Sequence, residues 1–580
     1  MTRFAEPATL LAFVLLSLPA SAESTDTPTP TADHPDPHPR ISIVHPGANS
    51  VRADLEYLLS LTTPEEQKQW ENVDDFLDSF MGGVDVELPI RVDLILRDTA
   101  LFYISSFPVN DVEEFLYNID LLGITSRRKA AQLFQLSELF EGWLRIKDKY
   151  GTFAEDAADV PPNFPDRQAA IADLLKREFD IATEIVNEDT SQAAIDSRHA
   201  IFQKIIDELL GLVEQRPDEV EVQYELRKNT FRHQLEILQR GFAQTRHLVL
   251  GWETDEQVHT GGLVFELSPI AETALAAEID LQCQEPGRFA AIERSESAIL
   301  SGRIKYRIAQ HYKVQLNEFW ALTHKNVLHR IQADDTRSAE EKESFNSLAN
   351  LVLEVINATT ESRVVDGFVE LVPGPNDGHT LVGGGVVPDD TDILPVLELI
   401  PYCRTGWEVE LNIETVGDIA IHRVKVQIDR ATQFTDFFGT DSEFLVGTGT
   451  GVVWLATGEG SLTALKTAIE TLNGENPGLA EDPFIDVQIR FGDWLSLLDR
   501  VCADDPEPVD EDEKTQREER DALRALALQA FEAGEDRLSI RAARAGDQVK
   551  GRMTVESAIL RFVGKAIADF SKENLDFDDE

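Results

Sequence analysis

Three aspartates in the stretch VPDDTDI, namely Asp389, Asp390 and Asp392, could bind a metal ion. Ca²⁺ takes about six to eight oxygen ligands in flexible geometry, and clustered carboxylates can supply them. A loop that caps the following helix would use the same residues, because Asp is favoured just before a helix. We favour the cap and keep a Ca²⁺ site at these aspartates as the alternative.

A second acidic loop, ADDPEPVDEDE, offers further carboxylates at Asp504, Asp505, Asp510 and Asp512. It allows the same calcium chemistry, but a solvated loop is the simpler interpretation because carboxylates occur throughout this chain. A glycosidase with two catalytic carboxylates also stays open, since the separation of such a pair is spatial and cannot be read from sequence.

The densest run of glycines, GTGTGVVWLATGEGSLTALKTAIETL, could at first sight wrap a phosphate. A dinucleotide fingerprint needs a strand, a glycine turn and then a helix. Here a second strand follows the glycines, so Gly447, Gly449 and Gly451 predict a hairpin turn. We expect the helix only from Ser461, with Leu462, Leu465, Ile469 and Leu472 in the core, and we predict no nucleotide cofactor.

Motifs whose spacing dictates a mechanism are missing from the sequence. It contains no G-x-S-x-G turn, H-E-x-x-H helix, C-x-x-C pair, phosphate loop or intact EF-hand. His311, His324 and His329 lie in one expected helical region, but their spacing does not align them on one face. Catalytic residues are therefore not identified, and a protein without enzymatic activity is favoured.

The cysteines and the charge limit the classes of partner. Cys283, Cys403 and Cys502 allow one disulfide whose pairing the sequence does not decide, and buried unpaired thiols are the alternative. The chain has 53 Lys and Arg against 105 Asp and Glu, a net charge of −52. This charge repels nucleic acid and anionic membranes and favours basic partners or divalent cations, although it also serves simple solubility.

The N-terminus predicts export. Arg3, the apolar stretch 10–18 and the small residues 20–22 have the pattern of a signal peptide, so we expect a mature chain from Glu23. No later stretch has the roughly 20 apolar residues of a membrane anchor. The segment 23–40, rich in Pro, Thr and Asp, is expected to be a disordered leader.

A repeated order of strand, strand and helix runs through the rest of the chain. In IRVDLIL, Ile90, Val92, Leu94 and Leu96 share one strand face, while Arg91 and Asp93 take the other. A helix capped by Asn110 and ended by Gly123 follows the partner strand. The same order recurs at 261–292, 365–400, 407–438 and 537–570, and the glycine run makes a sixth unit, which suggests duplication.

These units predict an α+β fold with antiparallel sheets covered by helices and with inserted helical hairpins. Within the first helical hairpin, 161–247, we expect a break near Pro217 and a second helix capped by Asp218, with an apolar stripe that includes Leu235 and Leu238. The expected organisation is a signal peptide (1–22), a leader (23–40), an α+β module (41–160), a helical hairpin (161–247), an α+β module (248–302), a helical insertion (303–360), α+β modules (361–500), an acidic loop and helix (501–535) and a last module (536–580).

Three stretches resemble a group of exported proteins of planctomycete-type bacteria: the one from IVHPGANS to RVDL, HLVLGWETDE and ESAILSGRI. The resemblance covers most of the mature chain. The function of the group is not known, so it implies export and a shared fold but no activity and no site residues. Folding explains part of the first stretch, because Thr63, Pro64 and Glu66 have the pattern of a capping box.

We therefore expect an exported binding or structural protein of the periplasm or cell surface, with a protein or envelope component as its partner. Two alternatives stay open. One is a secreted hydrolase whose site is assembled from distant residues, and the other is a carrier of an apolar ligand held between sheet and helices.

Overall fold

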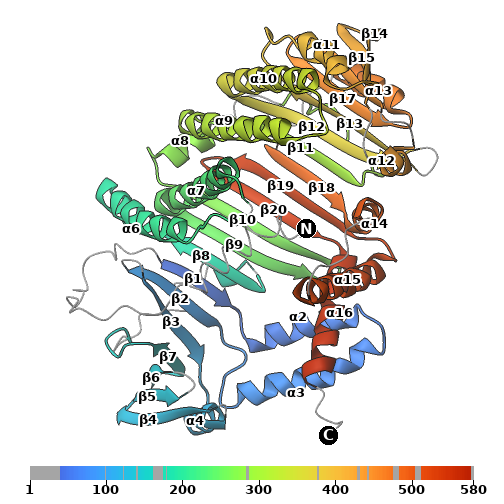
Figure 1. Ribbon diagram of the computed structural model, residues 1–580. Coiled ribbons are helices and arrows are strands. Elements are labelled where there is room, and N and C mark those ends of the chain that lie inside the picture. Colours follow the sequence, from blue (N-terminus) through green and yellow to red (C-terminus); the bar gives the residue numbers. More distant parts are fainter. Residues whose placement is uncertain are drawn as a thin grey trace. The chain divides into compact units, whose positions relative to one another are not determined.

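The structure is a computed structural model of the chain (Figure 1). It describes residues 40–575 apart from 98–99, 122, 139–140, 161–173, 178, 218, 283–286, 375–377, 427–430, 440–442, 474–482 and 503–510. The expected signal peptide, the leader up to residue 39, Cys283 and Asp218 lie outside the described residues, as do residues 504–510 of the acidic loop.

The chain divides into two compact units. Unit 1 comprises Met1–Leu209, Ile237–Ile270 and Val563–Glu580, and unit 2 comprises Leu210–Glu236 and Ala271–Phe562. Antiparallel strands and packed helices make up each unit, which confirms the predicted α+β class. Among the described residues, no helix is both long and apolar enough to cross a membrane.

Unit 1 is built on antiparallel strands in the order β4-β5-β6-β7-β3-β2-β1-β8-β9-β10. The strands are β1 Arg40–His45, β2 Ile90–Arg97, β3 Ala100–Pro108, β4 Ile124–Ala130, β5 Leu133–Glu138, β6 Gly142–Lys147, β7 Tyr150–Ala154, β8 Ile181–Val186, β9 Thr245–Asp255 and β10 Thr260–Pro269. Alternating burial along β5 and β6 places Phe134, Leu136, Leu144 and Ile146 in one core cluster with Phe115.

The helices of unit 1 include several from distant parts of the chain. They are α2 Ala48–Ser60, the 3₁₀ helix η1 Glu66–Gln69, α3 Trp70–Met81, α4 Val112–Leu121, most of α6 Gln192–Gly211, the end of α7 Glu221–Gln244 and most of α16 Ser557–Asn574. Leu59 of α2, Val73 of α3 and Ala568 of α16 form one buried cluster. The predicted capping box is confirmed, since Thr63 N donates to Glu66 Oε2 at 2.8 Å and Glu66 N to Thr63 Oγ1 at 3.4 Å.

Unit 2 is built on antiparallel strands in the order β14-β15-β16-β17-β13-β12-β11-β18-β19-β20. The strands are β11 Leu300–Arg307, β12 Val364–Pro373, β13 His379–Val386, β14 Glu408–Val416, β15 Ile419–Lys425, β16 Glu443–Gly449, β17 Val452–Gly458, β18 Ile485–Arg490, β19 Arg537–Ala545 and β20 Gln548–Val555. The helices are α8 Ala274–Leu281, α9 Gln310–Ala333, α10 Ala339–Ser362, α11 Leu394–Cys403, α12 Ala431–Phe438, α13 Ser461–Asn473, α14 Phe491–Cys502 and α15 Glu511–Phe531.

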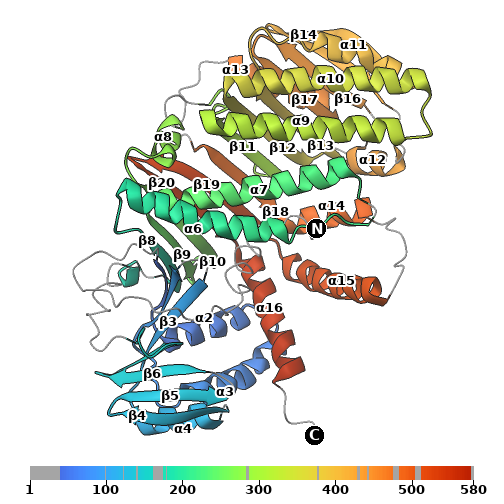
Figure 2. The same ribbon diagram turned by 60° about the vertical axis from the view of Figure 1, so that its left-hand side comes forward.

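Helices cover the sheet of unit 2. The long hairpin of α9 and α10 lies over β11, β12 and β13 in both views (Figures 1 and 2). Helix α13 buries Leu465 and Ile469 against Trp454 of β17 and Leu445 of β16, in the largest core cluster of the unit. The expected core positions Leu462 and Leu472 of this helix pack against the same cluster.

The strand-strand-helix order is confirmed at five of the six expected positions, from β2-β3-α4 to β19-β20-α16. Within 261–292 only one strand, β10, precedes the helix α8, because its partner β9 lies before that segment. The glycine run forms β16, β17 and α13, so its hairpin is confirmed as well. Only Gly451 of the three named glycines takes a positive φ, at 71°. Gly447 and Gly449 lie within β16 and were wrongly placed in the turn; a Cβ on Gly449 would meet Ile419 Cδ1 at 2.2 Å.

Three local predictions were wrong, and one group of strands was not predicted. The segment 161–247 is not purely helical, because strand β8 lies inside it and pairs with β1 and β9. Asp111 rather than Asn110 caps α4, since its Oδ1 accepts from Glu113 N at 2.9 Å and Glu114 N at 3.1 Å. Leu238 is exposed, whereas Leu235 of the same stripe is buried. The strands β4 to β7 were not predicted as a separate group.

The polar face of β2 is buried, which the alternation of residue types did not predict. Arg91 and Asp93 are each 5% exposed. Arg91 Nε donates to Asp93 Oδ1 at 2.8 Å, and Ser42 Oγ of the neighbouring strand β1 donates to the same oxygen at 2.6 Å. Buried charges are tolerated when they are paired and hydrogen-bonded, so this network lets a polar face lie inside unit 1.

Candidate functional sites: an acidic cluster and an apolar groove

An acidic cluster in unit 1 combines three segments of the chain. Asp54 lies on α2, Asp180 precedes β8, and Glu256 lies in the turn between β9 and β10. Burial, followed by repulsion from Asp180 and Glu256, raises the pKa of Asp54 to about 7. A carboxyl with this pKa is partly protonated at neutral pH and can therefore either donate or accept a proton.

Asp180 has the same tendency. Burial raises its pKa, and the charges of Glu253 and Glu256 add to this effect, while hydrogen bonds with Thr254 lower it. Its Oδ2 atom is shielded from solvent and has no hydrogen-bond partner among the described atoms. Within the described part of the chain, neither Asp54 nor Asp180 forms an ion pair that would offset the effect of burial on its pKa.

Tyr57 and His259 adjoin this cluster. A hydrogen bond of 3.0 Å joins Tyr57 Oη and His259 Nδ1, and the two rings are stacked with an interplanar angle of 2°. Burial, with Glu256 and Asp255 nearby, raises the pKa of the Tyr57 hydroxyl. Distant sequence segments thus bring together carboxyl, phenol and imidazole groups, which are the usual groups of proton transfer.

An apolar groove of about 620 Å³ lies in unit 2 among α10, α11 and β14. Its walls are Leu351 of α10, residues of α11 and strand residues of β14 (Pro395, Glu398, Leu399, Pro401, Tyr402, Val409 and Leu411). Tyr402 is 69% exposed and Leu411 is 40% exposed. Large apolar side chains that stay exposed beside a groove indicate a surface that binds a partner or ligand.

The groove is held on both sides by ordinary packing. Leu397 and Cys403 of α11 are buried beneath it, and Phe345 of α10 contacts Trp407 just before β14 with ring centroids 5.6 Å apart. Arg337 lies 4.0 Å from the centroid of the Phe345 ring. These contacts hold the wall elements in place, while the side chains that face the groove stay exposed to solvent.

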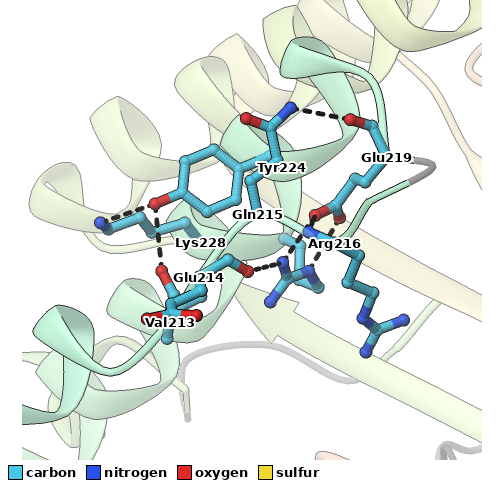
Figure 3. Close-up of polar contacts among 8 residues, drawn as sticks. Val213, Glu214, Gln215, Arg216, Glu219, Tyr224 and Lys228 are labelled. Carbon is cyan, nitrogen blue, oxygen red and sulfur yellow. Dashed lines mark hydrogen bonds and ion pairs between the residues drawn. The ribbon is translucent and has the colours of Figure 1, made fainter.

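The loop between α6 and α7 carries the densest polar network of the unit (Figure 3). Glu219 accepts from Arg227 Nε at 2.8 Å and from Arg227 Nη2 at 2.7 Å, and it also accepts from the backbone N of Arg216. The hydrogen bonds from Arg227, reinforced by Arg216, lower the pKa of Glu219 to about 2. Tyr224 Oη donates to Val213 O at 3.0 Å, so this network fixes the hairpin and holds no open site.

The predicted metal ligands Asp389, Asp390 and Asp392 are exposed in the loop before α11. Asp392 Oδ1 accepts from Leu394 N at 3.0 Å at the start of α11, but Ile393 is the N-cap residue and makes no side-chain cap hydrogen bond. In the ranges that the structure covers, no group of three or more His, Cys, Asp or Glu side chains is placed to hold a metal ion. The side chain of Asp512 lies outside the described residues.

Cys403 is a free buried thiol. Its Sγ donates to Leu399 O at 3.6 Å, and burial raises its pKa to about 11. This thiol takes no part in a disulfide, which answers one part of the open pairing question. Of the expected histidine group, His311 lies 3.8 Å from Glu278 and points to that neighbour instead of to a shared metal site.

Neither candidate site was predicted from the sequence. Asp54, Asp180 and Glu256 are far apart along the chain, and acidic residues are too common here for any one to stand out. The sequence of α11, LPVLELIPYC, is typical of an ordinary buried helix. The available sign of an exposed groove wall was Tyr402, which follows Pro401 inside the helix. In comparisons with protein-family profiles, curated proteins and solved structures, nothing matches this chain.

Proposed function

We propose that this chain is an exported protein of the periplasm or cell surface that binds a protein or another envelope component and catalyses no reaction. The observation that carries the proposal is the apolar groove of unit 2, with Tyr402 and Leu411 exposed at its rim. Exposed apolar walls lose unfavourable contact with water when a partner covers them. The signal-peptide pattern and the resemblance to exported bacterial proteins support the location.

The open form of the groove favours a protein side chain or segment as its occupant over an enclosed apolar carrier ligand. A carrier encloses most of its ligand surface. Here Tyr402 and Leu411 face solvent and leave one side uncovered. The acidic composition adds that a basic partner would be attracted over long range.

Native mass spectrometry of the protein, purified from its own compartment without denaturant, tests this proposal. We expect a species whose extra mass shows a bound partner. Leu411→Ser and Tyr402→Ser should each reduce the fraction of protein in this bound form at least several-fold. Leu212→Ser is the matched control, because Leu212 is 77% exposed in the α6–α7 loop and does not line the groove. A bare wild-type mass, or a bound mass that the groove variants leave unchanged, would contradict binding at this groove.

A secreted hydrolase is the second candidate, and the acidic cluster of unit 1 favours it. Asp54, with a pKa of about 7, could exchange protons at neutral pH, and Asp180 beside it supplies a second carboxyl. The test is a panel of glycoside and peptide substrates. Turnover that Asp54→Asn abolishes, with a pH profile that bends near 7, would establish this candidate, and no turnover of any substrate would remove its support.

A further inference from the structure

We propose that the free edge of β14 binds an extended polypeptide segment in which apolar and basic residues alternate, with the apolar side chains entering the groove. This inference rests on the proposed function and names the partner's chemistry and its mode of binding. It follows from three features of β14: its unpaired edge, the different chemistry of its two faces, and an acidic side chain that lacks a cation among the described residues.

The first feature is the edge itself. β14 pairs with β15 on one side, and no strand in the described ranges pairs with its other side. Glu408, Glu410, Leu411 and Asn412 of this strand are exposed. The pairing with β15 is regular over Glu408–Glu410 and is interrupted between Glu410 and Glu414, where Asn412 has a φ of 53°. The regular part of the outer edge therefore presents N–H and C=O groups that an added strand can pair with, as in other proteins that bind peptides by sheet extension.

The second feature is the difference between the two faces. Side chains alternate along a strand, so Val409 and Leu411 point to one face, and both line the groove. Glu408 and Glu410 point to the other face. Directly opposed side chains on neighbouring strands lie about 5 Å apart, so an added strand meets apolar groups on one face and carboxylates on the other. Alternating apolar and basic residues match this pattern.

The third feature is unused negative charge. Glu410 accepts from Arg423 at 2.7 Å and is already paired. Glu408 forms no ion pair or hydrogen bond among the described residues, and Lys425 is the residue opposite it on β15. A lysine or arginine of the added strand would therefore gain a partner at Glu408.

A second copy of this chain is a poor occupant of the same edge. Pairing β14 with β14 would set the acidic face of one copy against the acidic face of the other, and like charges in cross-strand positions are destabilising. The net charge of −52 adds repulsion between whole molecules. Charged edge strands are a common protection against self-association, and the same charges attract a basic strand.

Fluorescence anisotropy of labelled peptides against the whole purified protein tests the proposal. The first probe is an eight-residue peptide of alternating Val and Lys, and its matched control alternates Val and Glu. We expect saturable binding of the Val–Lys peptide and binding at least tenfold weaker for the Val–Glu peptide. Glu408→Gln should weaken binding of the Val–Lys peptide about three- to tenfold and make that binding less dependent on salt, because one charge contact is lost.

Two further sets of variants separate strand addition from simple attraction of charge. Leu411→Ser should weaken binding at least tenfold, whereas Leu212→Ser should leave it unchanged. In the peptide, the N–H groups of the Val and the Lys residues point to opposite edges of the strand. N-methylation of one set should therefore cost at least tenfold in affinity, and N-methylation of the other set should cost little.

Equal binding of both peptides, or equal effects of the two N-methylated sets, would overturn strand addition. So would a Val–Lys peptide that does not bind a protein whose thermal unfolding is normal. If that failure occurred while Leu411→Ser still removed the native bound mass, the groove would remain a binding site and only the strand-addition inference would fall. If the Val–Lys peptide does not bind and Leu411→Ser leaves the native bound mass unchanged, the proposed function would fall as well.

Discussion

Lys565 on α16 donates to Glu66 Oε1 at 2.6 Å, a contact that joins two residues 499 positions apart in the sequence. Lys565 is 6% exposed. Burial alone would raise the pKa of Glu66, but the hydrogen bonds from Lys565 and Thr63 lower it below its ordinary value. Glu66 therefore serves two roles, because its other oxygen closes the capping box with Thr63.

Lys565→Met should lower the free energy of unfolding of unit 1 by about 2–3 kcal/mol, since it leaves a half-buried carboxylate without its cation. Lys68→Met is the matched control: Lys68 pairs with Glu65 on the surface, where both side chains are mostly exposed. It should change stability by less than about 0.5 kcal/mol. Urea unfolding followed by tryptophan fluorescence measures both variants, and equal effects would mean that the buried pair contributes nothing special.

Asp54→Asn should stabilise the protein above pH 7 and remove part of its pH dependence. The pKa of Asp54 is raised from 3.8 to about 7 on folding. Between these values the folded state holds a proton that the unfolded state has released, so stability falls as pH rises through this range and levels off above it. After allowing for partial solvent exposure, we expect a gain of about 1–3 kcal/mol at pH 8.

Thermal unfolding of the wild type and the variant between pH 4 and pH 9 checks this prediction. The curves should converge near pH 4 and separate as pH rises. Glu56→Gln, on the exposed side of the same helix α2, is the control and should leave the curve parallel to the wild type. A constant offset of Asp54→Asn at every pH would show that Asp54 does not titrate between its two states as we expect.

Glu219→Gln should lower the protection of the α6–α7 loop (Figure 3) from hydrogen exchange and make that protection independent of pH in the acid range. The pKa of Glu219 is lowered to about 2, so its stabilising contribution is complete above the ordinary carboxyl pKa near 4.5 and is lost as pH falls toward 2. Hydrogen exchange of the backbone amides between Val213 and Tyr224 measures the effect. In the wild type, exchange corrected for its intrinsic pH dependence should rise at low pH, and in Glu219→Gln it should already be fast at pH 7.

Glu214→Gln is the control for the loop, because the Glu214 side chain is exposed and only its backbone O accepts from Arg227. It should keep the protection of the wild type at each pH. Equal loss of protection in both variants would attribute the effect to a general change of charge in the loop, against a specific role for the Glu219–Arg227 pair.

Gly458→Ala should destabilise unit 2 by at least about 3 kcal/mol, because Gly458 has a φ of 96° and its added Cβ would lie 1.9 Å from His379 O. Gly460→Ala should cost only about 1 kcal/mol, since Gly460 also has positive φ, 80°, but has open space around it. Urea unfolding of the two variants compares a steric with a purely conformational requirement. A similar loss of unfolding free energy in both variants would show that β17 and β13 can move apart at this contact without a large cost.

Local patterns predicted much of the fold and little of either candidate site. Alternation and helix caps lie within a few residues of one another, so five of the six strand-strand-helix units and the Thr63 capping box could be inferred. The burial of Arg91 and Asp93 could not, because it depends on Ser42, 51 residues before Asp93. Strand β8 is short and sits beside helical sequence, and its pairing with β1 and β9 decides its conformation.

The acidic cluster could not be predicted from the sequence either, because it also depends on contacts between distant residues. The raised pKa of Asp54 comes from burial and from charges on two other segments, and no sequence spacing records these. In the groove, the sequence of α11 shows apolar residues but not which of them the sheet leaves uncovered. Composition predicted a preference for basic partners, and the position of Glu408 on the edge strand now gives that preference a specific place to be tested.

The return of α16 to α2 and α3 also sets an order for assembly. Residues 271–562 supply most of unit 2 and leave the ribosome before Lys565 and Ala568, which unit 1 requires. Leu59 and Val73 emerge near the beginning and must wait for their covering helix. The part of the protein that is synthesised first is therefore completed last, and its uncovered apolar surface is where we expect a chaperone to bind during folding.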